Sequence, residues 1–90
     1  MHRTVEIFVL GYVQAVGYRL FTKRYANHFH VTGFVQNQAD GSVKVIASGD
    51  EANLASFIEK LREGPRIAIV KNLKMTWLDW SDIYTEFKII

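Results

Sequence analysis

Every second position along residues 4–10 holds an apolar residue. Val5, Ile7 and Val9 fall on one face of this segment, and the residues between them fall on the other. A repeat of two residues is typical of a strand with one buried face. The pattern therefore predicts a first strand over residues 4–10.

The spacing of apolar residues changes between Gly11 and Tyr18. From residue 19 onward, Phe21, Tyr25 and Phe29 recur at every fourth position, which is the spacing of one face of a helix. We therefore expect a helix that begins near residue 19 and buries this aromatic face. The segment before it is expected to be the loop that joins the strand to the helix.

A hairpin and a second helix are expected next. Residues 31–38 and 42–48 have strand-like patterns, and the Asp40-Gly41 pair between them favours a tight turn. Asp50 is a suitable N-cap for the following helix, which Gly64-Pro65 ends. The apolar residues with helical spacing in this second helix are Leu54, Ile58 and Leu61.

The rest of the chain has two strand-like segments. Residues 66–78 predict a long strand, interrupted near Lys71-Asn72, and residues 85–90 predict a short extra one. The resulting order, β-α-β-β-α-β with a short C-terminal strand, is that of the ferredoxin-like α/β plait. We expect a single α+β domain over residues 1–90, with both helices on one face of an antiparallel sheet.

Composition narrows the classes of function. The chain has 90 residues and no cysteine, which excludes disulfides, thiol nucleophiles and thiolate metal sites. A formal charge of +2 with scattered positive residues favours small anionic ligands over nucleic acid. No apolar run reaches the roughly 18–20 residues of a membrane span, and no signal-peptide pattern is present. We expect a cytoplasmic protein that binds neither membranes nor nucleic acid.

Residues 11–19 lead from the first strand into the first helix and end at Arg19. Unpaired backbone N–H groups converge at the start of a helix, where the helix dipole also favours an anion. Arg19 can add a planar guanidinium that binds phosphate or carboxylate. The alternative is an ordinary connecting loop whose Arg19 faces solvent.

Asn37 is the second candidate for chemistry. It lies at the end of a predicted strand, on the same face as the inward Val35, and its amide both accepts and donates hydrogen bonds. Such a group can hold a water molecule in position. The alternative is an asparagine placed for the turn that follows it.

These two segments resemble the two signatures of the acylphosphatase family. Residues 11–19, Gly-Tyr-Val-Gln-Ala-Val-Gly-Tyr-Arg, are similar to its Gly-x-Val-Gln-Gly-Val-x-(Phe/Tyr)-Arg signature. Residues 33–41, Gly-Phe-Val-Gln-Asn-Gln-Ala-Asp-Gly, are similar to its Gly-(Trp/Phe)-Val-x-Asn-x-x-(Asp)-Gly signature. The two occur in the family's order, and the resemblance covers essentially the whole chain.

The resemblance implies hydrolysis of small acyl phosphates to a carboxylate and inorganic phosphate, without metal or cofactor. It implies that Arg19 binds the phosphoryl group and that Asn37 orients the attacking water. Because an acyl phosphate already has a good leaving group, positioning and charge stabilisation are expected to suffice. The residues whose backbone amides match the family's phosphate cradle are Gln14, Ala15, Val16, Gly17 and Tyr18.

The chain departs from the family pattern at three positions. Ala15 stands where the family has glycine, and Tyr12 stands where arginine is common. A positive φ at Ala15 would strain the loop by roughly 1–2 kcal/mol, whereas a negative φ would only stiffen it. The alternative function is therefore a catalytically impaired member that binds phosphate or another anion. His30, where glycine is frequent, is expected to adopt the left-handed conformation.

Other interpretations fit the residues less well. RNA-binding plaits stack bases on aromatic residues of their central strands, and residues 43–47 contain none. Larger carbamoyl-transfer enzymes use the same motif in an amino-terminal domain, but the length of this chain favours a separate enzyme. His2, His28 and His30 lack the neighbouring carboxylates that would suggest a metal site. We expect a monomer.

Overall fold

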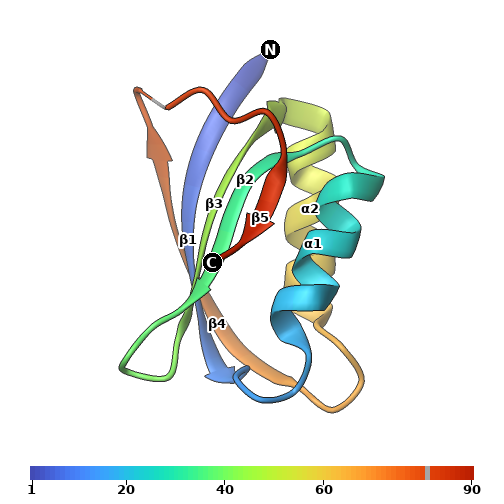
Figure 1. The fold of residues 1–90 in the computed structure, drawn as a ribbon, viewed down its shortest axis with the longest axis vertical. Coiled ribbons are helices and arrows are strands. Elements are labelled where there is room, and N and C mark those ends of the chain that lie inside the picture. The colour runs from blue at the N-terminus through green and yellow to red at the C-terminus, as the bar shows by residue number, and fades with distance from the viewer. Residues whose placement is uncertain (81) are drawn as a thin grey trace.

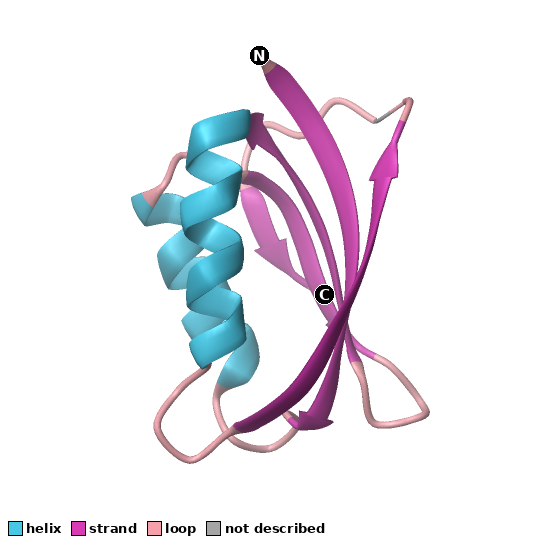
Figure 2. Ribbon diagram, turned by 180° about the vertical axis from the view of Figure 1, so that it is seen from behind, coloured by secondary structure: helices cyan, strands magenta, loops and turns pink. Residues whose placement is uncertain are grey.

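The computed structural model describes residues 1–80 and 82–90. In this part of the chain, two helices pack on one face of a five-stranded sheet (Figure 1 and Figure 2). The elements follow one another in the predicted order. They are β1 (His2–Tyr12), α1 (Tyr18–His28), β2 (Thr32–Asn37), β3 (Val43–Asp50), α2 (Glu51–Glu63), β4 (Ile69–Leu78) and β5 (Phe87–Ile89).

The strand order in the sheet is β4-β1-β3-β2-β5. β1 pairs antiparallel with β3 and β4, and β2 pairs antiparallel with β3. β5 pairs parallel with β2, so the prediction of an antiparallel sheet is wrong at this edge. Figure 1 shows the cause, because β4 and β5 lie at opposite edges and the chain returns to the sheet in the direction of β2. The ferredoxin-like α+β class is confirmed.

The two central strands supply the middle of the core. Their alternate residues are fully buried beneath the helices, as the repeat of two predicted. In β1 and β3 these residues are Val5, Ile7, Val9, Val43, Val45 and Ala47. Burial of each valine or isoleucine in this set stabilises the folded state by about 1.5–3 kcal/mol. Leu54, Phe57 and Leu61 of α2 belong to the same buried cluster.

The aromatic face predicted for α1 is not its most buried face. Phe21, Tyr25 and Phe29 are only partly buried, and their rings pack beside one another along the helix. A repeat of four residues shows which side chains share a face of the helix, but not how deeply that face is buried. Small side chains such as those of Thr22 and Ala26 let the helix approach the sheet more closely. The fully buried residues of α1 are Tyr18, Thr22 and Ala26.

Both predicted ends of α2 are confirmed. The Asp50 side chain accepts a hydrogen bond from the backbone N–H of Ala52 (3.2 Å), and Gly64 caps the other end with a φ of 68°. Neither α1 nor α2, in the described part of the chain, has the length and apolar character needed to cross a bilayer.

The edge strands differ from their predicted bounds. β4 begins at Ile69 because the N–H of Ala68 donates to the carbonyl of Pro65 (3.0 Å) in a preceding turn. The predicted interruption near Lys71 is confirmed, since Leu10 pairs with Asn72 whereas the next residue pairs with Val70. β5 is shorter than the predicted segment and ends the sheet beside β2.

Candidate active site

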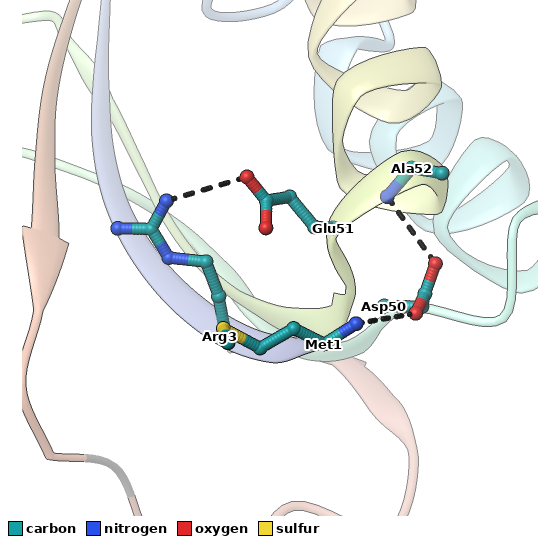
Figure 3. Close-up of polar contacts among 5 residues, drawn as sticks. All are labelled: Met1, Arg3, Asp50, Glu51 and Ala52. Atoms are coloured by element: carbon teal, nitrogen blue, oxygen red, sulfur yellow. Dashed lines mark hydrogen bonds and ion pairs between the residues drawn. The ribbon is translucent and has the colours of Figure 1, made fainter.

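The loop before α1 leaves the amino terminus of that helix open. Gly17 is the N-cap residue, with a left-handed backbone (φ 78°), and within the described chain no side chain caps the helix and no acidic residue lies in its first turn. The amino terminus of α2 is different, because Asp50 caps it and Glu51 follows (Figure 3). Free N–H groups and the positive helix end together make the start of α1 suitable for an anion.

Arg19 lies in the first turn of α1, beside this open end. Its side chain is partly exposed, and in the described parts of the chain it makes no ion pair with a carboxylate. The guanidinium is therefore available to an external anion. An arginine of this kind binds two oxygens of a phosphoryl group at once.

Asn37 ends β2 and shares the helix-covered face of the sheet with Val35. Its Oδ1 atom is buried and has no hydrogen-bond partner among the residues that the structure describes. Buried acceptors are nearly always paired, so an unpartnered one is unusual and marks Asn37 as a candidate for chemistry. The side-chain amide also carries N–H donors, and such a group can hold a water molecule.

One pocket of about 220 Å³ brings these groups together. Small-molecule sites usually begin at roughly 300 Å³, so a pocket of this size suits a small substrate. Its lining residues are Val13, Ala15, Gly17, Tyr18, Arg19, Leu20, Asn37 and Ile89. Five of the seven predicted site residues are thus at the pocket.

The other two predicted cradle residues, Gln14 and Val16, do not line the pocket. The Val16 side chain is buried in the core. The side-chain amide of Gln14 donates to the carbonyls of Gln38 (2.8 Å) and Ser42 (2.9 Å). Sequence reasoning missed this tie to the hairpin, because it assigned Gln14 only a backbone amide.

The hairpin that Gln14 contacts is itself rigidly built. The Asp40 carboxylate accepts hydrogen bonds from the backbone N–H (2.9 Å) and the hydroxyl (2.7 Å) of Ser42. These bonds from Ser42 lower the pKa of the Asp40 carboxyl below its usual value. The predicted turn at Asp40-Gly41 is confirmed, with Gly41 at a φ of 94°. The hairpin therefore offers the loop a fixed surface.

Tyr18 anchors the start of α1 from the core side. Its hydroxyl donates to the carbonyl of Leu61 in α2 (2.8 Å), and its own carbonyl accepts from the Thr22 hydroxyl (2.8 Å). Burial raises the pKa of Tyr18 above its usual value of 10.0, so the phenol keeps its proton, and can donate this bond, even in alkaline solution. The pocket thus has a fixed floor on the helix side.

Ala15 has a φ of 61°, in the left-handed region. The sequence left open whether φ at this position is positive or negative. The positive, strained case holds, at a cost of roughly 1–2 kcal/mol. Ala15 nevertheless lines the pocket together with Gly17 and Arg19. The left-handed conformation expected for His30 is confirmed, with a φ of 57°.

Comparison with known proteins decides the family. The Acylphosphatase family model matches residues 5–89. The chain belongs to the acylphosphatase family. It is 41% identical to an acylphosphatase from Salinibacter ruber, over 97% of this chain and 92% of that protein. It is 43% identical to an acylphosphatase from Actinobacillus succinogenes, over 93% of each.

The fold agrees with that of a solved acylphosphatase. The crystal structure of acylphosphatase from Bacillus subtilis superposes with a TM-score of 0.95 at 32% identity, covering 100% of this chain and 99% of that chain. The expectations of the acylphosphatase family and of an acylphosphatase hydrolase are confirmed by these matches. The roles of Arg19 and Asn37 stay predictions. The pocket also has three lining residues that the sequence did not indicate: Val13, Leu20 and Ile89. No local pattern could have placed Ile89 there, because it reaches the pocket through the pairing of β5 with β2, which joins residues far apart in the sequence.

Proposed function

We propose that this acylphosphatase carries out its reaction in the pocket between the start of α1 and the end of β2. The observation that carries the proposal is that Asn37, whose buried Oδ1 has no partner within the described residues, lines the same pocket as Arg19. One group suits a water and the other suits a phosphoryl group. Their shared pocket supports a hydrolysis in which water attacks phosphorus.

The open end of α1 and Arg19 bind the phosphoryl group. Backbone N–H groups of the cradle residues at the pocket, Ala15, Gly17 and Tyr18, donate to its oxygens, and the guanidinium adds two charge-assisted hydrogen bonds. These donors are held in place before the substrate arrives, by Tyr18 on one side and Gln14 on the other. Fixed donors stabilise the transition state without reorganisation.

Asn37 orients the nucleophile. Its side-chain amide forms a hydrogen bond with a water, whose oxygen attacks phosphorus in line with the bond to the acyl oxygen. A new P–O bond forms to the water oxygen, and the bond to the acyl oxygen breaks with its electron pair going to the carboxylate. A proton of the water passes to a phosphoryl oxygen, so the products are one carboxylate and one dihydrogen phosphate. Positioning and charge stabilisation supply the catalysis.

An impaired, phosphate-binding role remains the second candidate because of Ala15. The specific observation is its positive φ, which a non-glycine residue adopts only at a cost. Ala15 still lines the pocket between the loop and α1, which argues for a working cradle.

We infer that the enzyme acts as a cytoplasmic monomer without nucleic acid. The small net charge of +2, with positive residues scattered along the chain, supports the part of this inference that concerns nucleic acid. Size-exclusion chromatography with light scattering tests the monomer, since a stable dimer would double the measured mass.

Steady-state hydrolysis of benzoyl phosphate in the presence of a chelator tests the proposed roles. We expect Asn37→Ala to lower kcat by about 100-fold, the scale for losing one fixed catalytic donor or acceptor. Arg19→Gln is expected to lower kcat/KM and weaken inhibition by phosphate. Arg24→Gln and Asn27→Ala, also on α1 but outside the pocket lining, are the matched controls. Full turnover by Asn37→Ala would overturn the assignment.

A further inference from the structure

Leu20 is an exposed apolar residue at a chemically informative place. Its side chain is 70% exposed, and a single exposed leucine is ordinary on a protein surface. What distinguishes Leu20 is that it follows Arg19 in the first turn of α1 and lines the same pocket. A molecule whose phosphoryl group is bound by Arg19 in this pocket therefore shares the pocket with Leu20.

The pocket is apolar apart from the groups assigned to the reaction. Arg19 is its one charged lining residue in the described chain, and the side chains of Val13, Leu20 and Ile89 contribute hydrocarbon. These three come from the loop, from α1 and from β5. With the guanidinium engaged by the phosphoryl group, the pocket has no second charge for a charged acyl tail.

In-line attack separates the water from the acyl group. The water and the leaving carboxylate lie on opposite sides of phosphorus, so the acyl group extends away from the water that Asn37 holds. Asn37 comes from β2, whereas Leu20 comes from α1. The helix side of the pocket is thus the side available to the acyl group.

We propose that Leu20 is a specificity-determining residue that contacts the acyl group and favours uncharged apolar acyl phosphates, aromatic or branched aliphatic. This inference rests on the proposed function, because it places the phosphoryl group at Arg19 and the water at Asn37. An apolar acyl group that Leu20 covers is removed from water, which favours binding. An acetyl group is too short to gain as much binding free energy, and a carboxylate tail would lose its hydration at a cost.

The test compares benzoyl, acetyl and succinyl phosphate as substrates of the unchanged enzyme and of Leu20→Ser. Each substrate's own reactivity cancels when the variant's kcat/KM is divided by that of the unchanged enzyme. We expect the ratio of kcat/KM for benzoyl phosphate to that for acetyl phosphate to fall about tenfold, the scale for losing a small apolar contact. Inhibition by inorganic phosphate, which has no acyl group, is expected to stay unchanged.

Ile83→Ser is the matched control. Ile83 is 94% exposed and does not line this pocket, so its substitution removes apolar surface without touching the site. Leu20→Lys supplies a positive charge, and we expect it to raise kcat/KM for succinyl phosphate relative to benzoyl phosphate. A loss of preference for benzoyl phosphate in Leu20→Ser and a gain for succinyl phosphate in Leu20→Lys would then both be attributed to position 20.

The possible outcomes separate the two proposals. A benzoyl-to-acetyl ratio that Leu20→Ser leaves within twofold of the original, with normal turnover, overturns the role of Leu20 alone. An equal drop in the Ile83→Ser control also overturns it. Absence of hydrolysis of all three substrates by the unchanged enzyme, or full activity of Asn37→Ala, overturns the proposed function itself.

Discussion

The side-chain amide of Gln14 donates a hydrogen bond to the backbone carbonyl of Gln38 (2.8 Å). A second bond from the same nitrogen reaches the carbonyl of Ser42 (2.9 Å). Gln14 belongs to the first signature segment, Gln38 belongs to the second, and Ser42 follows the second directly. One side chain therefore joins the phosphate loop to the hairpin that follows Asn37. The distance between the cradle and Asn37 is thereby fixed by a contact that involves no substrate.

Gln14→Met is expected to loosen this connection. Methionine keeps the length of the side chain and removes both donors, which costs about 2 kcal/mol of unfolding free energy at about 1 kcal/mol for each bond. A loop that is less well placed is also expected to lower kcat about tenfold. Urea denaturation and benzoyl phosphate turnover measure the two effects.

Gln38→Ala is the control for that variant. It removes the Gln38 side chain, whose bonds to Gln36 are long (3.3 and 3.4 Å), and retains the carbonyl that accepts from Gln14. An equal loss of stability in both variants would show that the Gln14 amide has no special part.

Ala15→Gly is expected to stabilise the protein by about 1 kcal/mol, because glycine adopts a φ of 61° without strain. Ala39→Gly is the control, since Ala39 is exposed in a loop and has no positive φ. There glycine only adds freedom to the unfolded chain, at a cost of roughly 0.4–1 kcal/mol. Thermal and urea unfolding measure both changes. A rise of kcat by more than tenfold in Ala15→Gly would favour the impaired-binder function.

Gly33→Ala is expected to destabilise the sheet strongly. A Cβ built on Gly33, which has a φ of 136°, would lie 1.9 Å from the carbonyl oxygen of Ile46 in the neighbouring β3. Strain and forced separation of β2 from β3 together cost about 3 kcal/mol or more. Gly41→Ala is the matched control, because Gly41 also has a positive φ (94°) but open space around its Cβ. Similar losses in the two variants would contradict the steric explanation.

Asp50→Asn is expected to change how stability depends on pH. The amino terminus of Met1 donates to Asp50 (3.1 Å), and this bond and charge lower the pKa of the carboxyl below its usual 3.8. Because the pKa of Asp50 is lower in the folded state than in the unfolded state, the ionised carboxylate stabilises the folded protein fully above the usual pKa. This stabilisation is lost as the pH falls through the lowered pKa of the folded state. Asparagine keeps an oxygen for the N–H of Ala52 but has no charge, so its deficit relative to the unchanged protein should vanish at low pH.

Urea denaturation between pH 6 and 2 checks this expectation, with Asp79→Asn as the control. Asp79 is exposed and makes no ion pair in the described parts of the chain. A deficit of Asp50→Asn that stays constant over the whole pH range would contradict the role given to the Met1 contact (Figure 3).

Local features of the sequence were enough for much of the fold. The repeat of two at Val5, Ile7 and Val9 specifies a strand with one buried face, because neighbouring side chains of a strand point to opposite sides. Asp50 and Gly64 mark the ends of α2 through their own backbone chemistry. The sequence also specified the two segments that meet at the pocket.

Tertiary structure alone decided how these parts meet. The parallel pairing of β5 with β2 and the bonds from Gln14 to the hairpin join residues that are distant in the chain. The burial of Thr22 in place of the aromatic face of α1 depends on which side chain fits against the sheet. Local propensity carries no information on such contacts. The φ of Ala15 belongs here too, since the loop between β1 and α1 imposes a conformation that alanine by itself disfavours.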